Sequence, residues 1–164
     1  MDENTLMDPN KKTLIVFSGD LDKALAAFIL ANGAAAMGND VTMFFTFWGL
    51  NIIRKPEKVK VHRRPLQAAF GRMMPRGADR LGLSKMNFAG LGPVMMKKVM
   101  REANISTLNE LIAIAQEQEI TMVACTTSME VLGLTKEELL DGVELAGVAS
   151  YFEYADHANV NLLI

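Results

Sequence analysis

The sequence predicts an α/β protein, a three-layer α/β/α sandwich around a mostly parallel sheet of four to five strands, with an irregular and partly helical insertion. The first observation is that short apolar runs alternate with longer stretches of helical periodicity, the order that gives a parallel sheet covered by helices. The second is that turn-forming or capping residues follow four of these runs. In such sheets ligands bind beyond the carboxyl ends of the strands.

The first fifty residues predict one β-α-β unit. Residues 13–17 are a continuous apolar run, typical of a buried parallel strand, and residues 21–37 form a helix that ends at Gly38. Residues 41–47 are the second apolar run and predict the second strand. The crossover between the two strands is expected to be right-handed.

The C-terminal half continues the alternation. Helices are expected over residues 93–101 and 108–118, the second capped by Ser106 or Thr107, and residues 120–124 predict a short buried strand that ends at Cys125. After the helix that follows Cys125, the expected elements are a capped helical turn at 135–139, a strand at 142–146, a helix at 148–157 and a terminal strand at 160–164.

The length predicts one domain with a core of its own. Residues 1–10 are polar and acidic and are expected to form a disordered tail, and residues 11–164 form the domain. Its insertion, residues 54–92, carries three prolines and five glycines, with a short helix expected near residues 66–74. One cysteine allows no internal disulfide, and the chain start does not resemble a signal peptide, so a cytoplasmic protein is expected. No run approaches the ~20 apolar residues of a membrane span.

Cys125 is the candidate nucleophile. It stands where a strand stops and a helix begins, a position at which free backbone N–H groups and the helix dipole stabilise a thiolate. Thr126, Thr127 and Ser128 offer capping hydroxyls at the start of this helix. The alternative is a buried structural thiol, because free cysteine is among the most buried residue types.

The residues that follow four strands are expected to meet at one edge of the sheet. The candidate substrate-binding residues at this edge are Ser18, Gly19, Asp20, Trp48, Gly49, Thr126, Thr127, Ser128, Met129 and Gly147. Residues 18–20 match no nucleotide-binding glycine pattern and can equally be a simple helix cap, so no cofactor is predicted. One cysteine and two distant histidines match no metal-ligand spacing, so no metal is predicted.

Charge is strongly segregated along the chain. Residues 54–101, called the basic segment below, hold 13 Lys and Arg against Glu57 and Asp79, a net charge of +11. The rest of the chain holds 4 against 17, a net charge of −13, and the two parts give the overall −2. The segment also holds six of the twelve methionines. These features favour a homo-oligomer, an anionic ligand or peripheral contact with an anionic membrane over nucleic acid, and a solvated basic face is the simplest alternative.

Five segments together resemble the DsrE/DsrF-like family, in particular its longer DsrE-like or peroxiredoxin-like branch within the sulfur-relay superfamily. These segments are residues 12–20, 73–77, 84–92, 123–129 and 141–144. The resemblance covers residues 12–151, nearly the whole chain, although the long insertion departs from the short relay proteins. It implies oligomeric α/β subunits and, in active members, a cysteine after the third strand that carries sulfur as a persulfide. Cys125 is the matching position.

The resulting hypothesis is a sulfur carrier, or a sulfurtransferase, that exchanges sulfane sulfur with donor and acceptor proteins or small thiols through Cys125. Backbone N–H groups near residues 127–129 are expected to stabilise the anionic sulfur. Gly49 and Gly147 are expected to leave space beside the sulfur, and Trp48 to shield it from water. The alternative from another class is a non-catalytic oligomeric scaffold or adaptor, which docks a partner or an anionic membrane through the basic, Met-rich segment.

Overall fold

The computed structural model describes residues 8–164 and contains one five-stranded sheet in which all neighbouring strands are parallel. The strands are β1 (Asp8–Val16), β2 (Asp40–Phe45), β3 (Thr121–Cys125), β4 (Glu144–Ala146) and β5 (Ala158–Leu163). Their order across the sheet is β4-β3-β2-β1-β5. The prediction of a mostly parallel sheet of four to five strands is therefore confirmed.

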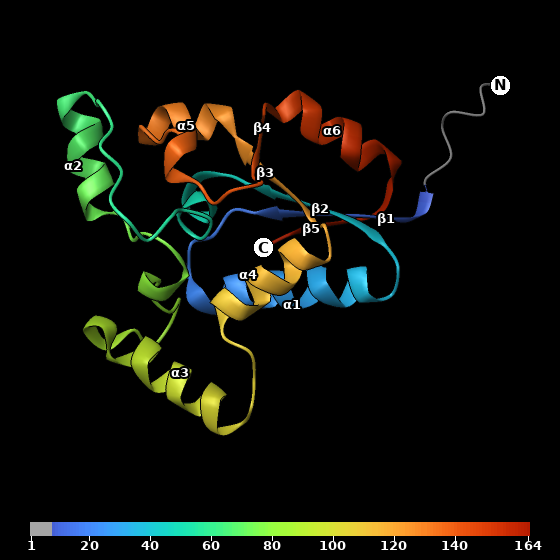
Figure 1. Cartoon of the computed structure of the whole chain (residues 1–164), viewed down its shortest axis with the longest axis horizontal. Coiled ribbons are helices and arrows are strands. Elements are labelled where there is room, and N and C mark those ends of the chain that lie inside the picture. Colours follow the sequence, from blue (N-terminus) through green and yellow to red (C-terminus); the bar gives the residue numbers. More distant parts are fainter. Residues whose placement is uncertain (1–7) are drawn as a thin grey trace.

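Two helices cover each face of the sheet (Figure 1). On one face lie α1 (Leu21–Ala36) and α4 (Leu108–Glu117), and on the other lie α5 (Thr126–Leu132) and α6 (Val148–His157). This arrangement confirms the predicted three-layer sandwich. None of the helices in the described part of the chain has the length and apolar character needed to cross a membrane.

Two further helices, one within the insertion and one that follows it, lie beside the layers on the side where α1 begins (Figure 1). They are α2 (Pro65–Met73) and α3 (Leu91–Glu102), and four short 3-10 turns complete the chain. These turns are η2 (Phe47–Asn51), η3 (Ala78–Arg80), η4 (Phe88–Gly90) and η5 (Lys136–Glu138). The Gly82 carbonyl accepts a 2.7 Å hydrogen bond from the Leu21 N–H, which ties the insertion to the start of α1.

Most strand and helix ends differ from the prediction by one or two residues, and the start of β1 differs by five. β1 begins at Asp8 rather than at residue 13, because its polar first half pairs through the backbone with β2 and β5. Residues 8–10 of the predicted tail therefore belong to the sheet, and residues 1–7 lie outside the described part of the chain. The second predicted strand stops at Phe45, because Phe47 takes a positive φ of 44° and opens η2.

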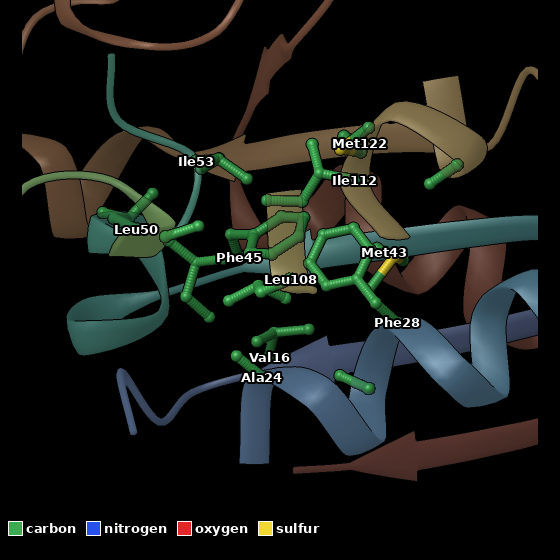
Figure 2. Close-up of a cluster of buried hydrophobic side chains, with 14 of the residues drawn as sticks. Val16, Ala24, Phe28, Met43, Phe45, Leu50, Ile53, Leu108, Ile112 and Met122 are labelled. Atoms are coloured by element: carbon green, nitrogen blue, oxygen red, sulfur yellow. The ribbon is translucent and has the colours of Figure 1, made fainter. Parts of the chain in front are cut away.

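The main core lies chiefly between the sheet and the α1–α4 pair (Figure 2), and Met129 and Leu132 of α5 also belong to this cluster. Met43 and Phe45 of β2 point toward Phe28 of α1 and Ile112 of α4, and Val16 of β1 lies beside them. Successive side chains of a strand point to opposite faces of the sheet. Phe44, between Met43 and Phe45, therefore faces α5 and α6. The smaller apolar cluster on that second face contains the candidate nucleophile.

Candidate functional site

Cys125 lies at the predicted junction. It is the last residue of β3 and also the N-cap residue of α5, with φ −67° and ψ 113°. Its side chain is only 2 % exposed and belongs to an apolar cluster with Phe44, Val123 and Tyr151. The rings of Phe44 and Tyr151 pack with their centroids 5.1 Å apart. The thiol is therefore enclosed by the layer that α6 forms over the sheet.

The predicted caps of α5 are wrong. Thr126, Thr127 and Ser128 belong to the first turn of the helix, and no side chain caps its N–H groups in the described part of the chain. The Thr126 hydroxyl instead donates to the Ala146 carbonyl at 3.4 Å, and the Ser128 hydroxyl lies 2.7 Å from that of Thr46. The first turn thus keeps N–H donors without a side-chain acceptor next to Cys125.

The strand ends do meet at one edge of the sheet, as predicted. A Cβ added at Gly19 would lie 2.7 Å from the Trp48 carbonyl oxygen, so the loops after β1 and β2 touch through their backbones. The Thr46–Ser128 contact joins the loop after β2 to α5, and a Cβ added at Gly147 would lie 4.0 Å from the Thr126 hydroxyl oxygen. The loops after β1 and β2, the start of α5 and the loop after β4 therefore lie next to one another at this edge.

Several of these residues have roles other than the predicted ones. Ser18 donates to the Asp20 carboxylate at 2.9 Å, and Asp20 also pairs with Lys23, so this turn satisfies its own polar groups. Trp48 is 44 % exposed and lies outside the cluster around Cys125, where Tyr151 provides the cover. The side chain of Met129 is buried in the main core.

Gly49 is required by backbone packing rather than by space around the sulfur. Its N–H donates to the Phe17 carbonyl at 2.9 Å, and a Cβ added to it would lie 2.0 Å from the Val16 carbonyl oxygen. That oxygen belongs to the backbone at the end of β1 and cannot move away as a flexible side chain can. The prediction that Gly49 makes room for the thiol is replaced by this backbone contact.

We expect Gly49→Ala to lower the free energy of unfolding by about 1–3 kcal/mol, because the new methyl group must push two backbone segments apart. Gly33→Ala is the matched control: Gly33 lies in α1 with nothing within 4 Å of an added Cβ. The control is expected to raise stability by about 0.5–1 kcal/mol, since alanine favours the helix. Urea denaturation of both variants measures the difference, and equal stability of the two would contradict the packing argument.

A buried ion-pair network lies next to this edge, and sequence reasoning did not identify it. Glu138 accepts from Arg54 at 3.1 Å and from Arg76 at 2.9 Å, and Arg63 also binds its carboxylate. The side chains of Glu138 and Arg54 are fully buried. Burial alone would raise the pKa of Glu138, but the hydrogen bond from Arg63 and the charge of Arg54 outweigh it and hold the pKa below its ordinary value.

Two signals in the sequence pointed to this network. Thr135 and Glu138 have the spacing of a capping box, of which the bond from the Thr135 N–H to the Glu138 carboxylate is present at 3.3 Å. Arg54 directly follows the buried pair Ile52 and Ile53. The network also shows that the basic segment does not lie wholly on the surface, because Arg54 is fully buried. Part of its charge is compensated within the chain.

The lowered pKa of Glu138 predicts a pH dependence of folding stability. A carboxylate with a depressed folded pKa contributes stability that is complete above its unfolded pKa, about 4.3 for glutamate. This contribution is lost as the pH falls through the folded pKa. We expect the stability difference between the wild type and Glu138→Gln to stay constant near neutral pH and to shrink below about pH 4. Urea denaturation across this range checks it, and a difference that does not change in acid would refute it.

Comparison of the sequence with known proteins shows the family to which this α/β protein belongs. The model of the DsrE/DsrF/DrsH-like family matches residues 9–163, and the chain belongs to this family. The Bacillus subtilis protein YrkE, described as uncharacterized, is 55% identical over 154 residues, which cover 94% of this chain and 96% of YrkE. The sulfur carrier protein DsrE2 of Allochromatium vinosum is 38% identical over 162 residues, covering 96% of this chain and all of DsrE2.

A solved structure supports the fold independently. The crystal structure of the YchN protein from E. coli superposes with a TM-score of 0.54 at 13% identity, covering 94% of this chain and 99% of YchN. The family predicted from the five sequence segments is thus confirmed by a match over nearly the whole described chain.

Proposed function

We propose that this protein is a cytoplasmic sulfur carrier or sulfurtransferase that holds sulfane sulfur as a persulfide on Cys125. Membership of the DsrE/DsrF/DrsH-like family and the likeness to a sulfur carrier protein support a role in sulfur relay. The observation that carries the assignment to Cys125 is its position as N-cap of α5, where N–H groups without side-chain acceptors favour an anionic sulfur.

The chemistry requires one nucleophilic sulfur and no change in net oxidation state. The Cys125 thiolate attacks the outer sulfur of a donor persulfide, a new S–S bond forms, and the donor's inner sulfur leaves as a thiolate. An acceptor thiolate then attacks the outer sulfur of the Cys125 persulfide and releases the Cys125 thiolate. Backbone N–H groups of residues 127–129 stabilise the terminal sulfur in the loaded state.

Burial of the thiol has a consequence for this cycle. At 2 % exposure the sulfur is protected from water and oxidants, so each transfer needs a local opening that exposes it. Tyr151 of α6 forms part of the cover, and its hydroxyl lies 3.3 Å from that of Thr13 in β1. Movement of α6 away from β1 is the opening that this arrangement favours.

A second candidate function is an oligomeric scaffold or adaptor that needs no chemistry at Cys125. Exposed apolar side chains on α2 and α3 favour it, because Leu66 and Met73 of α2 and Val94 of α3 are all more than 60 % exposed. Such surfaces mark interaction sites, here with a second copy of the chain or another partner.

Intact mass measurement after incubation with a persulfide donor distinguishes the two functions. A carrier gains the mass of one sulfur atom per chain, and dithiothreitol removes it, whereas an adaptor with an inert thiol keeps its original mass. The donor and acceptor can be proteins or small thiols, and the same assay with each candidate donor ranks them by the rate of loading.

A further inference from the structure

The insertion and the first half of α3 form a groove of about 1010 Å³. Its walls are α2, the first half of α3 and the loop segments 56–59 and 74–82. The apolar residues of the lining include Met73, Met74 and Val94, and no aromatic side chain lines it. Cys125 does not line the groove. Ligand binding in the groove can therefore be argued and tested without the sulfur chemistry proposed above.

The charge in this groove is strongly one-sided. Six cationic side chains line it, against one acid, Asp79; the six are Lys58, Arg63, Arg72, Arg76, Arg80 and Lys97. Lys97 pairs with Asp79 at 3.5 Å, whereas Lys58, Arg72 and Arg80 have no ion pair within residues 8–164. Apolar walls beside such a concentration of charge focus the electrostatic potential into the groove.

Two of the arginines are held in place before any ligand arrives. Arg63 donates through Nε to the Gly133 carbonyl at 2.7 Å, and Arg76 donates through Nη1 to the Glu57 carbonyl at 3.1 Å. Both arginines also form ion pairs with the buried carboxylate of Glu138. A fixed guanidinium loses less conformational entropy on binding an oxyanion than a mobile one does.

Glu138 does not neutralise these arginines. One carboxylate faces the three guanidinium groups of Arg54, Arg63 and Arg76, so this network keeps a net charge of +2, and its members Arg63 and Arg76 line the groove. Burial, and then repulsion by Arg76, lower the pKa of Arg54 below its ordinary value. Gly71 keeps the site open, because an added Cβ would lie 3.0 Å from Nη1 of Arg63.

We propose that this groove binds a multivalent oxyanion, a ligand that carries two or more phosphate-type groups. Guanidinium groups match the geometry of phosphate oxygens, and the groove is far larger than one phosphate ion needs. The lack of aromatic side chains argues against recognition of a nucleobase by stacking. The same chemistry is offered by a free polyphosphate and by a phosphorylated lipid headgroup.

Titration calorimetry with sodium tripolyphosphate tests the proposal. We expect saturable binding of one tripolyphosphate per chain, and weaker binding of orthophosphate. The variant Arg72→Gln/Arg80→Gln removes two exposed arginines that have no ion pair within residues 8–164, and it should weaken binding by about tenfold or more. The matched control Arg64→Gln/Arg101→Gln makes the same change next to α2 and in α3, outside the groove, and should alter affinity by about twofold at most.

Cosedimentation with phosphatidylcholine vesicles that contain a phosphorylated phosphatidylinositol distinguishes the two sources. Vesicle binding that tripolyphosphate displaces, and that the groove variant loses, identifies a lipid headgroup as the ligand and supports the site. Binding of tripolyphosphate without vesicle binding supports a free polyanion. Equal losses in the groove variant and the control, or no binding to either probe, would overturn the proposal.

Discussion

Replacing Cys125 with serine is expected to abolish persulfide loading completely while leaving the fold intact. Cys125 is the only cysteine of the chain, so the variant has no sulfur nucleophile of this kind. Serine is nearly isosteric, but its hydroxyl is not a thiolate and forms no persulfide. The variant should therefore lose persulfide loading but keep its fold, with a circular dichroism spectrum and an unfolding temperature close to those of the wild type.

The measurement is intact mass after incubation with a persulfide donor, followed by dithiothreitol. The wild type should gain one sulfur atom and lose it on reduction, and Ser106→Ala, a change in the loop before α4, should behave in the same way. Sulfur that remains on Cys125→Ser would show that the adduct is not a persulfide at this residue. A wild type that never gains mass would favour the adaptor function.

The parts of this molecule that follow from local pattern were predictable, and the parts that depend on distant residues were not. α6 begins and ends at the predicted residues 148 and 157, and each of the five strands overlaps the run predicted for it. The capping hydroxyls after Cys125 were misassigned, because their acceptors and partners, the Ala146 carbonyl and Thr46, come from other segments. Whether a hydroxyl caps its own helix depends on such competitors.

The candidate site shows the same division. The sequence indicated that Cys125 ends a strand and starts a helix, and that other strand ends lie nearby. It did not indicate that Tyr151, 26 residues later on α6, covers the thiol from the helix layer on that face of the sheet. Nor did it indicate that three arginines from one segment converge on Glu138, since this contact joins residues up to 84 positions apart.

Glu138→Gln is expected to lower the free energy of unfolding by about 3–5 kcal/mol, the largest stability change predicted for this chain. The amide has the size of the carboxylate but no charge, and it offers only one acceptor oxygen to three guanidinium groups. Arg54 is fully buried, so its charge stays in the protein interior without a counter-ion. Removing one partner of a buried ion pair costs more than the pair itself contributes, because the remaining charge is desolvated and unpaired.

Urea denaturation measures the effect as a shift of the midpoint with an unchanged slope. Glu130→Gln is the matched control, since Glu130 is exposed on α5 and forms no ion pair in the described part of the chain, and it should change stability by less than about 0.5 kcal/mol. A double-mutant cycle with Arg54→Gln should show that the two changes together cost less than their sum, because the unpaired charge is then removed as well. Two outcomes would contradict this prediction: stability losses of the two substitutions that add up fully, or a loss for Glu138→Gln no larger than that of the control. Either would mean that the three arginines find solvent or other acceptors when the carboxylate is absent. The net charge of the network would then be screened, and the electrostatic basis for binding a multivalent oxyanion would be weakened with it.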